Sequence, residues 1–170
     1  MSIEQSLIKS YLDEIGVNYH EKDEDTIVFP YTGDEDSKIM VVCRIMEDGE
    51  YFKMHTIKHL DDLMDNVADD KKNALKDWML YENYKTKTGS WEYDPSDNDI
   101  HFSVEYPIED GSLTMKQFTR GFAVVIKSAD KIPEMKKILG LVSGEVDEKE
   151  RKRQELLRQL QELESGSGSI

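Results

Sequence analysis

SWEYDPSDNDIHFSVEYP, residues 90–107, is the stretch that decides the fold of this chain. Its centre, DPSDND, is dense in side-chain oxygens. In the EF-hand type of calcium loop, the first, third, fifth and twelfth positions would be held here by Asp94, Ser96, Asn98 and Glu105. The stretch is therefore either a cation site between two helices or a turn between two strands.

The residues around this acidic loop favour a turn. The sixth loop position, which needs Gly, is held by Asp99. Aromatic or aliphatic residues alternate with polar ones on both sides of the loop: Trp91, Tyr93, Ile100, Phe102, Val104 and Tyr106. This period of two is typical of strands and carries Glu105 on the order of 20 Å from Asp99. We predict a hairpin; weak cation binding by Asp94, Asp97 and Asp99 is the alternative.

The rest of the chain divides into strand-like and helix-like segments. Residues 38–47, KIMVVCRIME, are apolar at both parities, which predicts a central strand. Hairpins are predicted around residues 23–26 and at Asp48-Gly49. Helical periodicity covers residues 5–15, a pair of helices within 58–84, a helix with capping-box spacing from Thr114 to Gln117, and a short helix near 130–140.

This order of elements predicts the α+β class. One helix is followed by three or four strands, a helical pair, two strands and closing helices (α-βββ(β)-α-ββ-α), so we expect an antiparallel sheet with helices packed on one face. The predicted domain spans residues 1–142, a charged amphipathic helix spans 143–164, and residues 165–170, SGSGSI, have the composition of a flexible end.

Composition and charge limit the classes of partner. The formal net charge is −14, and because seven acidic and five basic residues follow Gly144, the part before it carries −12. This charge repels phosphate backbones and anionic membrane surfaces, so we expect no nucleic acid and no membrane among the partners. One cysteine, Cys43, cannot form an internal disulfide, and no signal-peptide core is evident, so the expected location is cytoplasmic.

Two stretches of the sequence suggest a family. They are residues 81–118, YENYKTKTGSWEYDPSDNDIHFSVEYPIEDGSLTMKQF, and residues 8–29, IKSYLDEIGVNYHEKDEDTIVF. With these motifs the chain resembles the YbjN family, which has the type III secretion chaperone-like fold, over roughly residues 2 to 140. The resemblance implies a small acidic α+β domain without a catalytic centre. It also implies a homodimer of chaperone type that binds an extended client segment. The charged helix after Gly144 departs from the family pattern.

The sequence contains no constellation that indicates catalysis, so we expect no enzyme, no cofactor, no metal and no small-molecule substrate. His55 and His59 are four residues apart, but a predicted strand ends at the first of them, so helical metal-ligand geometry does not apply. We expect both to be solvated, as we do His20 and His101. Cys43 lies in the most apolar strand and is expected to be buried packing rather than a nucleophile.

Two apolar sets are candidates for binding a partner. The first is a methionine-rich surface on the central strands, comprising Met40, Val42, Met46 and Met54, with Tyr51 and Ile57 nearby. The second is a stripe in the C-terminal helix, comprising Leu156, Leu157, Leu160 and Leu163. We therefore predict a non-catalytic protein-interaction module of chaperone or adaptor type that binds an apolar segment of a partner. An acidic, cation-responsive regulatory protein is the alternative.

Overall fold

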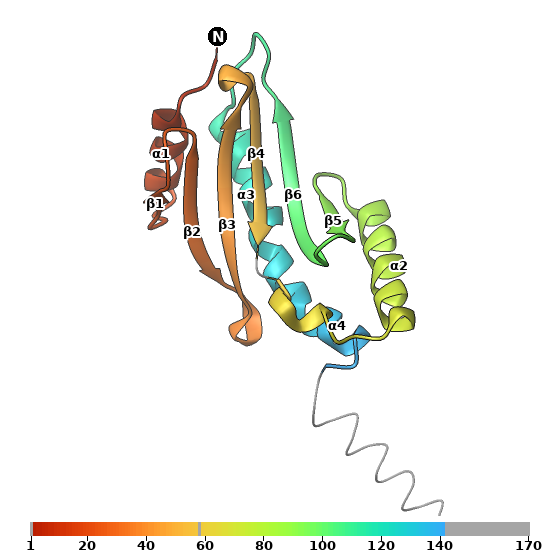
Figure 1. Ribbon diagram of the computed structural model, residues 1–170. Helices are drawn as coiled ribbons and strands as arrows, with labels where there is room; N and C mark the ends of the chain where they lie inside the picture. Colours follow the sequence, from red (N-terminus) through yellow and green to blue (C-terminus); the bar gives the residue numbers. More distant parts are fainter. Residues whose placement is uncertain (1, 58, 142–170) are drawn as a thin grey trace, which may run out of the picture. The chain divides into compact units, whose positions relative to one another are not determined.

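The computed structural model describes residues 2–57 and 59–141 (Figure 1). Its α-helices are α1 (Gln5–Glu14), α2 (Asp69–Lys85), α3 (Met115–Lys127) and α4 (Ile132–Ile138). Its strands are β1 (His20–Glu21), β2 (Thr26–Thr32), β3 (Lys38–Met46), β4 (Tyr51–Ile57), β5 (Ser90–Asp94) and β6 (Asp99–Pro107). Four 3-10 turns connect them: η1 (Asp34–Asp36), η2 (Glu47–Gly49), η3 (Asp61–Met64) and η4 (Ser128–Lys131). The α+β class predicted from the sequence is confirmed.

The strands form one antiparallel sheet in the order β1-β2-β3-β4-β6-β5. Four hairpins connect neighbours directly, and the chain leaves the sheet after β4 to form α2 before it returns to the far edge as β5. The predicted central strand is β3, which pairs along its length with β2 and β4.

Helices cover one face of this sheet. The side chains of Ile39, Val41 and Ile45 on β3 point to that face and are almost fully buried. Aromatic residues of α1 and α3 close the core, and the ring of Phe118 lies 5.4 Å from that of Tyr11 and 6.1 Å from that of Phe52. Figure 1 shows α3 behind the central strands, with the opposite face turned toward the viewer.

Gly121 allows α3 to approach the sheet closely. A Cβ atom at this position would lie 2.5 Å from the hydroxyl oxygen of Tyr106 on β6. The same hydroxyl donates a hydrogen bond to the carbonyl of Gln117, at 3.0 Å. The first turn of α3 is held by the predicted capping box, in which the Thr114 side chain accepts from the backbone N–H of Gln117 and the Gln117 side chain accepts from that of Thr114.

The outer edge of β5 is closed by a side chain of α2. Asn83 donates from Nδ2 to the carbonyl of Trp91 (3.1 Å) and accepts at Oδ1 from the Trp91 N–H (2.7 Å). The amide of Asn83 therefore satisfies the two backbone groups that an adjacent strand would otherwise bind. The rings of Trp78 and Trp91 lie 5.7 Å apart beneath this contact.

The acidic loop is a hairpin turn, as predicted. Asp94 pairs with Asp99 across the end of β5 and β6, and Asn98 adopts a left-handed backbone conformation with φ of 61°. The side chain of Asp94 accepts from the N–H of Ser96 at 2.8 Å, and that of Asp97 accepts from the N–H of Asp99 at 3.0 Å. Their oxygens therefore stabilise the turn. Among the residues described, no three His, Cys, Asp or Glu side chains are grouped as a metal site would require.

The helices predicted before α2 and at the C-terminal end have different outcomes. Between β4 and α2 the described chain forms only the short turn η3, so the predicted first helix of the pair is wrong in length. The helix predicted at 143–164 and the flexible end at 165–170 lie outside the described residues, and so do their leucines. In the ranges that the structure describes, no helix has the length and apolar content to cross a bilayer.

Candidate protein-binding face

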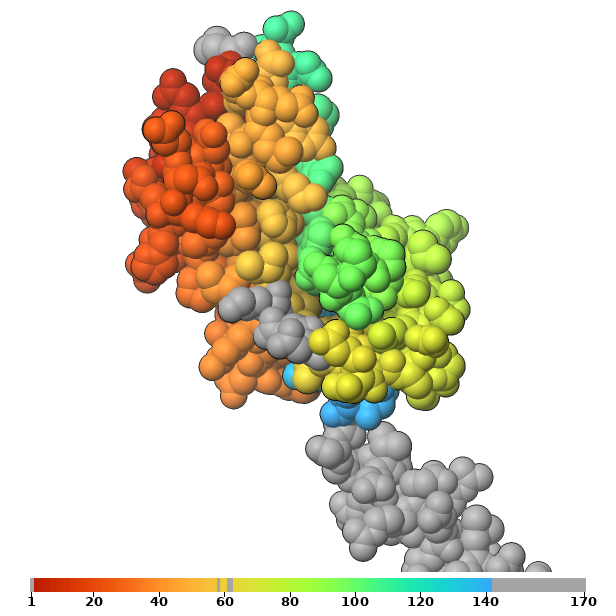
Figure 2. Space-filling model, viewed as in Figure 1, coloured from red at the N-terminus to blue at the C-terminus, as the bar shows by residue number. Residues whose placement is uncertain are grey.

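The sheet face opposite the helices is the candidate functional site. We call it the open face, because no described helix lies over it (Figure 1). Alternate residues of each strand point toward it, and the pairing register sets them in rows across the sheet. Figure 2 shows this face, with β3 and β4 in orange and yellow at the surface between the two flanking hairpins.

Two neighbouring rows of the open face are apolar on β2 and β3, and one of them is also apolar on β4. In one row Val28 pairs with Val42, and in the next row Pro30 pairs with Met40, which also pairs with Ile57. We call these five residues the apolar strip. Val42 at its centre is 9% exposed, because side chains of both neighbouring strands flank it, and the other four are half-buried or exposed. The strip is a contiguous apolar surface built by strand pairing alone.

The predicted methionine-rich surface needs one correction. Met54 pairs with Cys43 and is fully buried, so it faces the helix-covered core and not the open face. The prediction for this residue is wrong because the hairpin register gives Met54 the parity of the core residues. Met40, Val42 and Met46 do lie on the open face, but Met46 is separated from the apolar strip by the row that contains Arg44 and Lys53.

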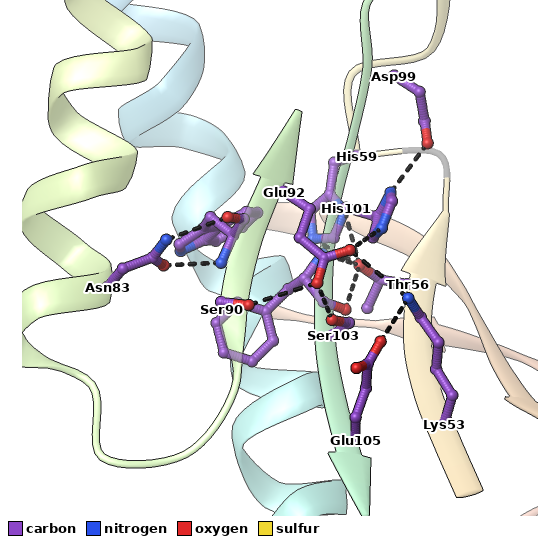
Figure 3. A network of polar contacts seen from close by, with 12 residues as sticks. Lys53, Thr56, His59, Asn83, Ser90, Glu92, Asp99, His101, Ser103 and Glu105 are labelled. Atoms are coloured by element: carbon purple, nitrogen blue, oxygen red, sulfur yellow. Dashed lines mark hydrogen bonds and ion pairs between the residues drawn. The ribbon is translucent and has the colours of Figure 1, made fainter. Parts of the chain in front are cut away.

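A network of charged residues occupies the other half of the open face (Figure 3). The ammonium of Lys53 lies 2.7 Å from a carboxylate oxygen of Glu105 and 3.5 Å from one of Glu92. Lys53 and the hydroxyl of Tyr51, which donates to Glu105 at 2.6 Å, together lower the pKa of Glu105. The same hydrogen bond raises the pKa of Tyr51 to about 12. The carboxylates are thus held ionised by their neighbours.

His101 is held between two carboxylates of this network. Its Nε2 lies 2.6 Å from Glu92 and its Nδ1 lies 3.0 Å from Asp99. Partial burial raises the pKa of Glu92, but hydrogen bonds from Ser103 and His101 outweigh it, and the net shift is downward. Both ring nitrogens of His101 are thus engaged by carboxylates of the network.

His55 connects the network to the apolar strip. Its ring lies 5.7 Å from that of His101, and its Nδ1 is buried with no hydrogen-bond partner among the described residues. Burial and the neighbouring His101 lower the pKa of His55 to about 4, so the ring is neutral at pH 7. A neutral imidazole beside Val42 extends the apolar strip toward β6.

Most charges of the open face pair with one another, and among the described residues Arg44 and Lys38 of β3 are exceptions. Arg44 is exposed, lies next to Lys53 across the β3–β4 pair, and makes no ion pair with any residue that the structure describes. The arrangement thus combines an apolar strip with a cation that is free to bind an acidic group. Such a surface suits binding by packing and ion pairing.

The prediction that His59 is solvated is wrong. His59 is 3% exposed and lies on the covered side, where its ring bonds to Thr56 and Ser128. The expectation of solvated histidines failed because the chain turns inward after β4. His101 was also predicted to be exposed, and it is half-buried in its carboxylate pair.

A second surface escaped the sequence analysis. Three large side chains on the outer side of α2 are strongly exposed: Leu80 (68%), Tyr81 (59%) and Tyr84 (87%). We call them the α2 patch. The sequence could have indicated this surface, because these three residues do not share the helical stripe of Leu75 and Met79, which are buried. A cluster of exposed large side chains on one helix is typical of an interaction surface.

Comparisons with known proteins give two solved structures of similar fold at low identity. A crystal structure of the ExsC–ExsE complex contains a chain that is 13% identical, with a TM-score of 0.49, covering 76% of this chain and 92% of that one. An uncharacterized protein from Methanothermobacter thermautotrophicus is 14% identical, also with a TM-score of 0.49, covering 81% of this chain and 99% of that one. No family model and no curated protein matches, so the resemblance to the YbjN family stays a prediction.

Proposed function

We propose that this chain is a non-catalytic protein-interaction module of chaperone or adaptor type that binds an apolar segment of a partner protein on the open face. The observation that carries the proposal is the apolar strip across the uncovered centre of the sheet. Each Å² of this apolar surface that a partner buries would stabilise the complex by roughly 25 cal/mol.

The partner segment that fits this face has apolar side chains beside an acidic one. Its apolar side chains would pack on the strip, where Met40 adapts to different shapes. Its carboxylate would bind Arg44, whose charge no described acidic residue neutralises. The net charge of −14 would also attract a segment rich in basic residues. On the open face, however, such a segment would bring further positive charge next to Arg44 and Lys53, which repel it.

The absence of catalysis is part of the same proposal. Burial raises the pKa of the Cys43 thiol far above its usual range, which removes it as a nucleophile at neutral pH. His59 is neutral and engaged at both ring nitrogens in the core. Both residues therefore support packing rather than chemistry.

We also propose that the protein is a homodimer, with the α2 patch as the surface of contact. The patch presents two tyrosines and a leucine, and aromatic residues are enriched at the centre of protein interfaces. It lies on the outer side of α2, away from the buried Leu75 and Met79. A second copy on this patch would leave the open face accessible.

The open face is tested with a photo-crosslinking amino acid, benzoylphenylalanine, placed at Met40 and, as a control, at the exposed Lys116 of α3. In the native cell, the Met40 position should give a discrete adduct that the Lys116 position does not. A synthetic peptide of the crosslinked segment should then bind in calorimetry.

Met40→Glu should weaken this peptide at least tenfold, because a buried carboxylate would lose its solvation. Met115→Glu, the same substitution on α3, should change the affinity less than twofold. Equal loss from both variants, or none from Met40→Glu, contradicts binding on the open face.

The dimer is tested separately by analytical ultracentrifugation. The wild-type chain should sediment as a dimer, and the double variant Tyr81→Glu/Tyr84→Glu as a monomer. Asn73→Glu, on the same helix outside the patch, should remain a dimer. A wild-type monomer overturns the dimer and leaves the proposal for the open face untouched.

A further inference from the structure

A small pocket lies on the helix-covered side of the sheet, between the end of α2, strands β5 and β6, and the end of α3. Its volume is about 150 Å³. Trp91, Phe102 and Val124 form its apolar wall, and Glu82, Lys127 and Lys131 line its polar side. Trp91 and Phe102 are 6% and 4% exposed, and their rings meet edge to face at 5.3 Å. The pocket therefore offers aromatic surface with charged groups at its rim.

The charges around this pocket differ from those of the whole chain. In a protein of net charge −14, Lys127 and Lys131 line this pocket together with Glu82, and Lys85 binds the same Glu82 carboxylate. Glu82 forms ion pairs with Lys85 and Lys131, and burial raises its pKa less than these lysines lower it. Glu82 is thus ionised at neutral pH and neutralises part of the positive charge.

Lys127 is the unneutralised cation of the group. It lies one helical turn before Lys131, is exposed, and has no carboxylate partner within the ranges that the structure describes. Lys131 also contacts Glu134 at 3.7 Å, and Glu134 accepts from the indole N–H of Trp78 at 3.0 Å. The acidic groups at the rim are therefore engaged, and the net local charge is positive.

We propose that this pocket binds a small aromatic monocarboxylate. The aromatic ring packs against the wall formed by Trp91, Phe102 and Val124, in a volume similar to an engineered apolar cavity that holds benzene. The carboxylate pairs with Lys127 at the rim. The charge of Glu82 disfavours a phosphate or a dicarboxylate, because a second negative charge would face it at close range. This site is separate from the open face and does not depend on the function proposed above.

The test uses 3-phenylpropanoate and its neutral amide, with binding followed by two-dimensional ¹H–¹⁵N NMR of the full chain. The carboxylate should shift the indole N–H of Trp91 and the amides of Phe102 and Lys127. We expect a dissociation constant on the order of 1 mM, as for other ligands of this size. The amide should bind at least fivefold more weakly.

Two variants identify the groups that bind. Lys127→Gln should weaken 3-phenylpropanoate at least fivefold and leave the amide unchanged, and Val124→Phe should abolish binding of both by filling the pocket. Their controls are Lys116→Gln and Ala123→Phe, exposed positions of the same helix, which should bind as the wild type does. Melting curves verify that all four variants are folded.

Three results would overturn the proposal. The first is that the Trp91 signal does not shift at 10 mM ligand, on the order of ten times the expected dissociation constant. The second is equal affinity for the carboxylate and the amide. The third is that Val124→Phe binds as the wild type does.

Discussion

His59 joins three segments that are far apart in the sequence. Ser128 donates its hydroxyl proton to the carbonyl of Val125 at 2.6 Å, so it accepts from Nε2–H of His59 at 2.9 Å. Nδ1 then accepts from Thr56, whose hydroxyl oxygen also accepts from the N–H of Phe102 at 2.9 Å. Every polar atom of the ring is satisfied in one neutral tautomer. Burial and, secondarily, His101 lower the pKa of His59 to about 3.

This arrangement predicts a loss of stability in mild acid. In the unfolded chain His59 binds a proton below about pH 6.5, whereas in the folded protein it stays neutral to about pH 3. The unfolded state therefore binds more protons in this window, and the free energy of unfolding falls with pH by up to about 1.4 kcal/mol per unit for this residue. His55 contributes in the same direction down to about pH 4.

Urea denaturation between pH 6.5 and pH 5 measures this slope, above the range in which most carboxylates titrate. His59→Gln should reduce the slope by the contribution of one proton. Asn73→Gln, a substitution at an exposed position of α2 that does not titrate, should leave the slope as it is in the wild type. An unchanged slope in His59→Gln would show that the folded protein protonates His59 in this range.

At the residue scale, the sequence predicts that a segment is a strand from the pattern of side chains along it. It does not predict contacts that depend on how distant segments pair. The two apolar parities of residues 38–47 correctly predict a central strand, and the structure places one parity, with Ile39, Val41 and Ile45, in the core. The face of Met54 depends on the register of the β3–β4 hairpin, which a list of nearby apolar residues does not take into account. The burial of His59 depends on Ser128, which is 69 residues later in the chain. Such contacts have no local signal.

At the scale of elements, the edge contact of Asn83 is the most specific feature. Its side chain replaces a neighbouring strand for Trp91, so removal leaves a backbone N–H and a carbonyl without partners. We expect Asn83→Leu to lower the free energy of unfolding by about 2 kcal/mol, within the cost of unsatisfied buried groups.

Chemical denaturation tests this expectation, with Asn73→Leu as the control. Asn73 lies on the same helix and is exposed, so its loss should change the free energy of unfolding by less than about 0.5 kcal/mol. Asn83→Leu should also make the protein more prone to associate through the freed edge. Equal effects of both substitutions would mean that the edge contact contributes nothing specific.

The hairpin between β5 and β6 leads to a prediction about calcium. Asp94 and Asp97 bind backbone N–H groups of their own turn, and Glu105 is engaged by Lys53 and Tyr51 on another part of the sheet. Their oxygens therefore do not converge. Calorimetric titration with calcium should give no saturable heat below millimolar concentration. A micromolar site that disappears in Asp94→Asn would restore the cation-responsive alternative.

Most elements could be predicted from the sequence because their signals are local. Thr114 and Gln117 identify the start of α3, and the alternation around the acidic loop identifies β5 and β6. The short turn η3 was mistaken for a helix because apolar residues at helical spacing, such as Leu60 and Met64, are buried without a helix to connect them.

At the scale of the whole molecule, the net charge of −14 predicts a dependence of stability on salt. Like charges repel one another in the compact state, and salt screens this repulsion over about 10 Å at 0.1 M. The melting temperature should therefore rise when sodium chloride is raised from 10 mM to 200 mM, a range that brackets this screening length. A fall would mean that ion pairs such as Lys53–Glu105 outweigh the general repulsion.

The class of the fold could be predicted from the order of elements, but the extent of the open face could not. Which strands are neighbours, and which side the helices cover, depends on packing between distant segments such as α1 and α3. The apolar strip is made of residues from three strands, and it becomes continuous only through their pairing. The sequence suggested Met40 and Val42 of the strip but not Val28 and Pro30, which β2 contributes.

The one-sided cover of the sheet has a consequence for how this protein can change over evolutionary time. Along β3, every second residue supports the core, and the residues between them, such as Met40 and Arg44, lie on the open face. Saturation mutagenesis of this strand should give tolerance that alternates from one position to the next. One strand can thus acquire a new specificity while the architecture it belongs to is inherited unchanged.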